Sequence, residues 1–331
     1  MLDYTRHLKG DPVPWLMEGE PWIRYRVLVD ILGKRLDDPE VQKERREVLN
    51  HPSAAVILDE TRSSRITSSD MMECYKPDEP VWRLWLLANA GLFWTDLGLR
   101  DEFWNTLFEL KDDEGASFKF STGDSRGLAC LSANTIYILL LLGFMGDVRL
   151  DRAYQHLLLT QGSDGGWHCD NTPGMEGLRE EKESCPFATI NVLQAFSVHP
   201  YIRYTGYPDA AVDLLLSCYE RRDEPYRPEG WGIGSDWHKL CFPHVNYGIL
   251  KFADVLSCFK VSHGDARFRH LLRLLLEKQD EEGRFPAEVI YPGLDRRLFG
   301  EQGEPSRWIT LVVLRSLVRM PSGLSLAPRE G

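Results

Sequence analysis

The chain has 331 residues, of which 43% are hydrophobic and 11% aromatic, enough to bury one large core or two ordinary ones. Its 39 lysine and arginine residues are outnumbered by 50 aspartate and glutamate residues, for a formal net charge of −11. This balance argues against a nucleic-acid binder, which needs a basic surface, and against an anionic membrane surface as the main partner.

The N-terminal stretch, residues 1–22, has no apolar leader segment, so we expect no signal peptide. The longest apolar run begins at Ile136 and falls short of the ~20 residues that span a bilayer, so we expect no transmembrane segment. Seven cysteines are an odd number, which favours reduced thiols over a disulfide framework. The sequence therefore predicts a cytoplasmic protein.

Residues 1–79 are predicted to form N-terminal helices and a loop. A proline at position 21 opens an apolar pattern with helical spacing, and a second, charged helix follows Pro39. Asp38 is the expected N-cap of that helix and Pro39 its first residue. Residues 61–80 are polar and lack a clear period, which is typical of a loop.

From residue 80 to residue 320 one order of elements recurs: an apolar helix, an amphipathic helix and a turn with glycine and an aromatic residue. Equivalent apolar helices are expected to start at Cys130, Cys185, His244 and Ser306, spaced 55, 59 and 62 residues apart. A repeat of this size indicates stacked helix pairs. We therefore predict an all-α fold in a single domain over 1–331, a closed ring of about five to six pairs with apolar helices inside and amphipathic helices outside, and a tail at 321–331.

The turn from Gln161 to Trp167, with the sequence QGSDGGW, resembles the QW motif of squalene-hopene cyclases and other class II terpene cyclases. The order of elements over 80–320 is similar to the prenyltransferase/squalene oxidase repeat, and residues 24–42 resemble small bacterial standalone proteins with this repeat, mostly of unassigned function. The resemblance implies an α/α toroid, with parallel inner helices around a central cavity. The chain departs from these cyclases because it contains neither an Asp-x-Asp-Asp nor an Asp-Asp-x-x-Asp sequence.

Parallel inner helices would bring several thiols and one imidazole to the same mouth of the ring. Cys130, Cys185, Cys241 and His244 lie near predicted helix starts, and Cys169 follows the Gly-Gly-Trp turn. Helix N-termini stabilise thiolates, and thiolates with imidazole are the ligands that zinc prefers. We therefore predict a zinc site formed by Cys130, Cys169, Cys185 and His244.

A second resemblance supports this site: protein prenyltransferase β subunits hold zinc with an Asp-x-Cys pair and a later histidine. Glu183 and Cys185, with His244, fall in similar places here, although glutamate replaces aspartate. Glu183, Cys241 and His244 are left as alternatives for the residue that completes the site. The alternative interpretation is that the thiols are small buried apolar groups, as we expect for Cys74, Cys218 and Cys258.

Aromatic and polar residues on the apolar helices are candidates for binding a small molecule, expected to be apolar or isoprenoid-like. The ligand-binding candidates are Trp82, Asn134, Tyr137, Asn191, Tyr247 and Trp308. Asp236 and Arg307, beside predicted inner helices, are the catalytic candidates.

Three functions follow. The first is a zinc-dependent transferase or cyclase. The second is a non-catalytic ligand-binding or scaffold protein with a structural metal site. The third is a sugar-acting enzyme that would use Asp236 and Glu183 as paired carboxylates. The sequence leaves the substrate, the presence of a reaction and the oligomeric state open.

Overall fold

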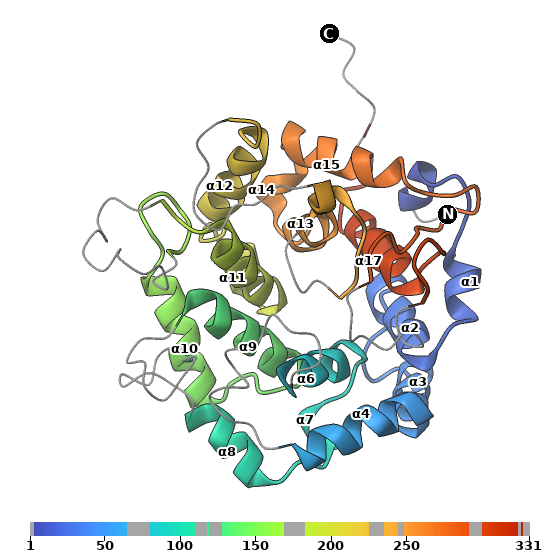
Figure 1. Cartoon of the computed structure of the whole chain (residues 1–331), viewed down its shortest axis with the longest axis vertical. Helices are drawn as coiled ribbons and strands as arrows, with labels where there is room; N and C mark the ends of the chain where they lie inside the picture. Colours follow the sequence, from blue (N-terminus) through green and yellow to red (C-terminus); the bar gives the residue numbers. More distant parts are fainter. Residues whose placement is uncertain are drawn as a thin grey trace. The chain divides into compact units, whose positions relative to one another are not determined.

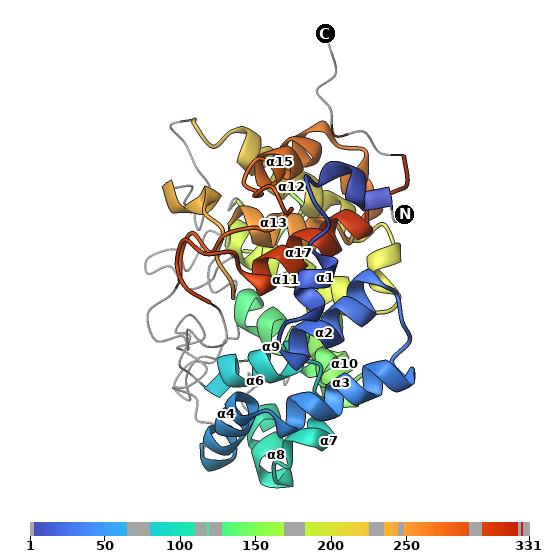
Figure 2. The ribbon, with the colours of Figure 1, turned by 90° about the vertical axis from the view of Figure 1, so that its right-hand side faces the viewer.

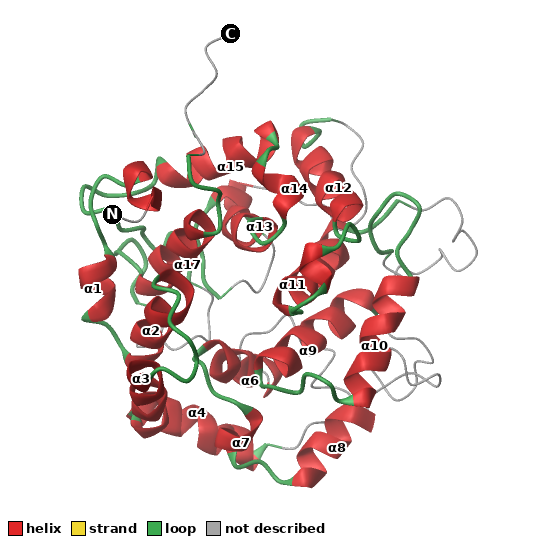
Figure 3. Cartoon of the chain, turned by 180° about the vertical axis from the view of Figure 1, so that it is seen from behind, coloured by secondary structure: helices red, strands yellow, loops and turns green. Residues whose placement is uncertain are grey.

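The computed structural model describes residues 3–64, 80–109, 118, 128–168, 183–224, 235–243, 248–290, 300–323 and 326. These residues form helices and loops, with no strand among them (Figure 3). Two isolated bridges, Cys241 with Val289 and Pro286 with Pro305, are the extended pairings in the described part of the chain. The all-α class predicted from the sequence is confirmed. None of the described helices has the length and apolar character of a membrane span.

The chain divides into two compact units, each described here by itself. One unit combines Met1–Ser53 with Gly234–Gly331, and the other comprises Ala54–Ile233. The N-terminal helices are thus part of the same unit as the last helices of the repeat.

The unit of Ala54–Ile233 shows the predicted alternation of apolar and amphipathic helices. Its elements are α4 (Pro52–Ser63), α6 (Pro80–Asn89), α7 (Trp94–Leu97), α8 (Asp101–Glu109), α9 (Ala129–Leu141), α10 (Val148–Leu159), α11 (Pro186–Val198), η3 (Ile202–Tyr204) and α12 (Asp209–Glu220). Helices α9 and α11 lie side by side (Figure 1) and are buried on most faces. Helix α10 instead buries one stripe, at Leu150, Ala153, Tyr154 and Leu157, the spacing expected of an outer helix.

The unit of Met1–Ser53 and Gly234–Gly331 places the two ends of the chain's helical part together. Its elements are η1 (Asp3–His7), α1 (Val13–Met17), α2 (Pro21–Arg26), η2 (Val27–Ile31, a π-helical turn), α3 (Pro39–Asn50), η4 (Ser235–His238), α13 (Ile249–Leu256), α14 (Lys260–His263), α15 (Ala266–Leu276) and α17 (Arg307–Val318). Helix α17 packs against α13 on one side and against α2 and η2 on the other (Figure 2). The predicted cap of α3 is confirmed, since the Asp38 carboxylate accepts a hydrogen bond from Glu40 N at 2.9 Å and Pro39 is the first helical residue.

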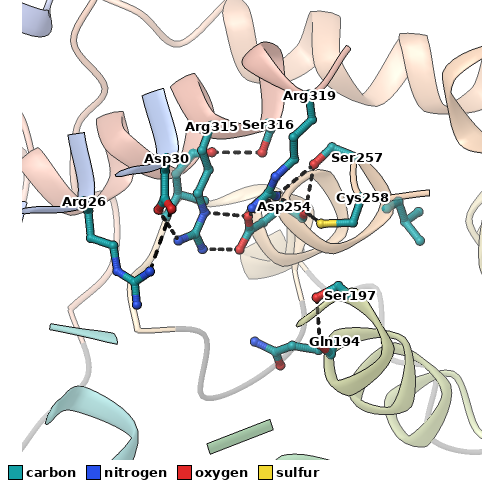
Figure 4. Close-up of polar contacts among 12 residues, drawn as sticks. Arg26, Asp30, Gln194, Ser197, Asp254, Ser257, Cys258, Arg315, Ser316 and Arg319 are labelled. Atoms are coloured by element: carbon teal, nitrogen blue, oxygen red, sulfur yellow. Dashed lines mark hydrogen bonds and ion pairs between the residues drawn. The ribbon is translucent and has the colours of Figure 1, made fainter. Parts of the chain in front are cut away.

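A buried ion cluster ties this unit together (Figure 4). Arg315 of α17 donates through Nε to Asp254 Oδ1 of α13 at 2.7 Å, and its second nitrogen binds the other carboxylate oxygen. Arg319 Nη1 adds a 3.0 Å bond to the same carboxylate, and Asp30 of η2 lies 3.7 Å from Arg315. Because buried charges are costly unless they are paired, the cluster fixes how η2, α13 and α17 pack.

Candidate metal centre and surrounding residues

The candidate metal centre begins with two thiols at the N-terminal ends of adjacent helices in the unit of Ala54–Ile233. Cys130 is the second residue of α9, and Cys185 is the N-cap of α11. Both are buried thiols. The expectation that these cysteines lie at the starts of apolar helices is therefore confirmed.

The Cys185 side chain caps its helix directly. Its Sγ accepts a hydrogen bond from Ala188 N at 3.5 Å, and Pro186 occupies the first helical position, where a missing N–H costs nothing. A helix N-terminus carries a partial positive charge, which favours the thiolate over the thiol. The Cys185 sulfur thus lies at the N-terminal end of α11.

The Gln161–Trp167 turn contacts the start of α11. Gln161 Nε2 donates to Gly165 O at 2.7 Å, and Gly165 adopts the left-handed conformation, with φ 94°, that a side chain would strain. The buried Trp167 donates from Nε1 to Leu157 O of α10 at 2.8 Å, and Trp167 O accepts from Cys185 N at 2.8 Å. The turn therefore has a structural role.

Asp164 and Ser184 clamp this turn to the residue before the cap. Ser184 donates to the two carboxylate oxygens of Asp164 through Oγ at 2.6 Å and through its backbone N at 2.8 Å, and Gly166 N adds a bond at 3.2 Å. Burial alone would raise the pKa of Asp164, but these hydrogen bonds outweigh it and hold the pKa below its usual value. Ser184 was not predicted from the sequence. The available signal was an Asp followed by two glycines, which is typical of a turn in which the Asp side chain accepts a backbone hydrogen bond.

The structure corrects the register of the repeat. The N-cap positions of α9, α11 and α17 are Leu128, Cys185 and Ser306, so Cys130 is not the equivalent of Cys185 but lies two residues inside its helix. The fourth apolar helix, α13, has Gly248 as its N-cap, whereas its start was expected at His244. The shift arises because neither Leu128 nor Gly248 has a capping side chain to mark the helix start.

Two of the four predicted zinc ligands, Cys169 and His244, lie outside the described residues. Within the described part of the chain no three or more His, Cys, Asp or Glu side chains form a group that could hold a metal ion. Cys169 and the alternative ligand Glu183 belong to the same unit as Cys130 and Cys185, whereas Cys241 and His244 belong to the other. The zinc site remains a prediction.

Two other described thiols, Cys218 and Cys258, differ from Cys130 and Cys185. Burial raises the pKa of the Cys218 thiol to about 11, against the opposing effect of Arg221, so this sulfur stays protonated at neutral pH. Cys258 Sγ donates to Asp254 O at 3.5 Å. Cys74 lies outside the described residues. Cys218 thus behaves as the small buried apolar group that we expected.

The ligand-binding candidates are distributed over the apolar helices. Trp82 on α6 is buried with its ring 5.3 Å from that of Trp85, and Tyr137 on α9 donates through its hydroxyl to Asn89 Oδ1 at 3.2 Å. Asn134 on α9 is half-buried.

Asn191 on α11 is also buried, and its Nδ2 donates to Phe187 O one turn earlier at 2.7 Å. Trp308, on α17, stacks on Phe242 at 4.6 Å. Tyr247 lies outside the described residues. Their role in binding a ligand stays a prediction.

The catalytic candidates make local contacts. Asp236 in η4 is exposed and forms an ion pair with Lys239 at 2.6 Å. Arg307 donates from Nε to Trp15 O at 3.3 Å, and its guanidinium lies 4.7 Å from the centre of the Trp15 ring. These contacts occupy both side chains with neighbours of their own unit, and their catalytic role stays a prediction.

No protein-family model matches the sequence, and no curated protein matches it either. Solved structures of type II terpene cyclase MstE from Scytonema do match. The ligand-free cyclase has 15% identity and a TM-score of 0.43, over 90% of this chain and 87% of that chain. A variant in complex with its substrate, geranylgeranyl dihydroxybenzoate, has 15% identity and a TM-score of 0.41 over 90% and 87%.

A crystal structure of a protein from Actinoplanes also matches, with 14% identity and a TM-score of 0.40 over 90% and 89% of the two chains. Class II terpene cyclases are the family whose α/α toroid the sequence predicts. At this level of similarity no residue role is transferred from these structures.

Proposed function

We propose that the protein binds an apolar, isoprenoid-like small molecule and holds a zinc ion with the thiolates of Cys130, Cys169 and Cys185. The observation that carries the metal is the N-cap of α11. A thiol, Cys185, stands there, whereas a hydroxyl, Ser306, stands at the start of α17. Because a hydroxyl is the better capping group, capping alone does not account for the sulfur.

The three thiols belong to one unit. Trp167 O accepts the hydrogen bond of Cys185 N, and Cys169 follows Trp167 by two residues, which span at most about 7 Å. Cys130 is the second residue of α9, which packs along α11. Zinc bound by such thiolates would supply a Lewis acid or activate a substrate thiol.

Glu183 is the ligand that would complete this site within the same unit. Its side chain is exposed and it precedes the Cys185 cap by two residues. His244 and Cys241 are the alternatives, both in the other unit. The choice is open to test, because each residue can be replaced singly while zinc content is measured.

The proposal of an apolar ligand is supported by aromatic residues on buried helices. Polar atoms beside these rings are held in place by hydrogen bonds within the protein. The Trp82 and Trp85 rings pack together, and the Tyr137 hydroxyl is held by Asn89, whose Nδ2 in turn donates to Trp85 O at 2.8 Å. Small-molecule sites commonly combine aromatic walls with a few fixed polar groups. Trp82, Asn134, Tyr137 and Asn191, all in the unit of Ala54–Ile233, would then face the ligand.

The metal is tested by elemental analysis of protein purified without chelator. We expect stoichiometric zinc in the native chain and its loss in Cys185→Ser, a substitution that keeps the cap because Ser306 fills the equivalent position. Cys258→Ser in the other unit is the matched control and should retain zinc. A native protein without zinc, or a Cys185→Ser variant with full zinc, would remove this proposal.

The second candidate function, a non-catalytic binding protein with a structural metal, is favoured by the missing acidic cyclase sequences. Removing zinc with a chelator distinguishes a structural metal from a catalytic one. A structural zinc contributes directly to folding, so its removal should lower the melting temperature strongly. If zinc serves chemistry alone, chelation should leave the melting temperature near its original value and change only the handling of a probe such as geranylgeraniol.

Binding of the apolar ligand has its own readout. Geranylgeraniol should quench tryptophan fluorescence saturably in the native protein. Tyr137→Phe, which removes only the hydroxyl, should weaken binding several-fold, and Trp82→Ala more strongly. Quenching that is not saturable, or that is unchanged in both variants, would contradict the assignment of these residues.

A further inference from the structure

A cavity lies apart from the thiol-bearing helix starts, within the unit of Ala54–Ile233. Its volume is about 480 Å³, and it is bounded by α7, α8, the turn after α9 and the start of α10. Small-molecule sites usually measure roughly 300–1,000 Å³. The cavity shares no residue with the predicted zinc site or with the ligand-binding candidates.

Aromatic and sulfur-containing side chains form the walls of this cavity. The Phe144 ring lies 5.7 Å from the ring of Trp94 and 4.9 Å from that of Trp104. Trp94 is 41% exposed and Met145 46% exposed, and both line the same cavity; apolar side chains that are exposed next to one another can mark a ligand-binding groove. Gly143, in the left-handed conformation, forms the turn that carries Phe144 and Met145.

Polar groups of α8 lie at the rim. Asp101 is exposed and forms no ion pair with any described residue. Trp104, one turn further along the same helix, is buried, and its indole Nε1 has no hydrogen-bond partner within the described residues. A buried donor without a partner is unusual in a native protein.

The aromatic cluster already attracts one cation from the chain itself. The Arg149 guanidinium lies 3.9 Å from the centre of the Phe108 ring, and it also binds Asp147 Oδ2 at 2.7 Å. Arg149 is thereby matched by Asp147, which leaves the Asp101 carboxylate as the net charge at the rim. An exposed indole face beside an excess carboxylate is electrostatically complementary to a cation.

We infer that this cavity binds an organic cation with apolar substituents, of the quaternary ammonium class. The positive centre would lie against the Trp94 ring and near Asp101, with its methyl groups in contact with Phe144 and Met145. A hydroxyl or carbonyl oxygen on the ligand would accept a hydrogen bond from the indole N–H of Trp104. This site is independent of the proposed zinc and isoprenoid functions.

The test uses choline and its neutral isostere, 3,3-dimethylbutan-1-ol, on the full chain. Binding is followed by NMR shifts of the tryptophan indole resonances. Choline should give saturable shifts, and the neutral isostere should bind roughly tenfold more weakly, because it lacks the charge that a cation–π contact needs. Equal affinity for the two compounds, or no saturable shift with choline, overturns the inference.

Two variants and a control locate the site. Trp94→Ala should weaken choline binding roughly tenfold, and Asp101→Asn, an isosteric surface change, about threefold with reduced salt dependence. Tyr201→Ala removes an aromatic side chain that is 76% exposed in the same unit but outside the cavity, and should leave binding unchanged. Binding that is insensitive to Asp101→Asn and Trp94→Ala would place the cation elsewhere and refute the inference.

Discussion

The turn from Gln161 to Trp167 and the turn from Gln279 to Phe285 lie in different units, yet they share one backbone frame. Gly162 N donates to Gly166 O at 2.8 Å in the first, and Asp280 N donates to Arg284 O at 2.9 Å in the second. The fifth residue is a left-handed glycine in both, with φ values of 94° and 76°.

Each turn is also anchored to the following apolar helix in the same way. Trp167 N donates to Thr189 Oγ1 at 3.2 Å, and Phe285 N donates to Thr310 Oγ1 at 3.0 Å. The Phe118 backbone N likewise donates to Ser132 Oγ of α9 at 2.9 Å. The hydroxyl one turn into each apolar helix thus receives a buried amide that would otherwise be unsatisfied.

The difference between the two turns is the segment on which they pack. Gln161 Nε2 donates to Tyr207 O just before α12, whereas Gln279 Nε2 donates to His7 O in the N-terminal segment. A Cβ added at Gly165 would meet the backbone of Ala210, and one added at Gly283 would meet that of Gly10. The N-terminal segment therefore packs on the Gln279–Phe285 turn in the way that the start of α12 packs on the Gln161–Trp167 turn.

The largest effect on stability is expected at the aromatic residue that ends each turn. Trp167→Ala should lower the free energy of unfolding by about 4 kcal/mol, because it removes a fully buried ring from a packed core. Trp167→Phe copies the second turn and gives up only the indole bond to Leu157 O, so we expect a loss of about 1–2 kcal/mol. Urea denaturation followed by circular dichroism measures both.

Phe285→Ala is the counterpart in the other unit and should cost about 3–5 kcal/mol, since Phe285 is also fully buried. If Trp167→Phe were as harmful as Trp167→Ala, the ring would contribute little and the shared packing role would be wrong.

The next largest effect is expected at the glycine. Gly165→Ala and Gly283→Ala combine a left-handed backbone with a Cβ that would lie 2.7 and 2.5 Å from neighbouring atoms. Each should destabilise the protein by about 2–3 kcal/mol. Gly33→Ala, left-handed but with open space around it, should cost only about 1 kcal/mol. Similar losses at all three positions in thermal melts would show that packing on Ala210 and Gly10 is unimportant.

The sequence predicted what local patterns encode. Helical periodicity indicated the apolar and amphipathic helices, and Asp38 marked the start of α3. It did not indicate that α9 starts at Leu128, because no capping side chain stands there.

Contacts that depend on tertiary folding were also beyond the sequence. The bond between Gln279 and His7 joins residues 272 positions apart, and the bond between Asp164 and Ser184 spans 20 positions. No local spacing predicts such pairs. The cavity beside Trp94 was missed for the same reason, since α8 and the turn after α9 meet only in the folded chain.

Exchanging the N-cap residues of α11 and α17, Cys185 and Ser306, should have a smaller effect on stability. Ser306→Cys replaces a hydroxyl that accepts from Ile309 N, and should cost about 0.5–1 kcal/mol. Cys185→Ser should be neutral or stabilising by a few tenths of a kcal/mol, roughly the reverse change. Chemical denaturation of both variants checks this. A strongly destabilised Cys185→Ser protein, prepared with chelator so that no metal contributes, would show that the thiol packs in a way a hydroxyl cannot.

The smallest effect is expected from the charge of Asp164. Hydrogen bonds from Ser184 and Gly166 lower the pKa of Asp164 in the folded protein against the opposing effect of burial, so its contribution to stability is present above the unfolded pKa of about 3.9. That contribution is lost as the pH falls through the folded pKa. Native protein should therefore be more stable than Asp164→Asn at pH 7, and the gap should close toward pH 3 in urea titrations. The gap will be modest because the carboxylate is partly exposed. A gap between native protein and Asp164→Asn that stays the same from pH 7 to pH 3 would mean that the hydrogen bonds from Ser184 and Gly166 do not favour the carboxylate.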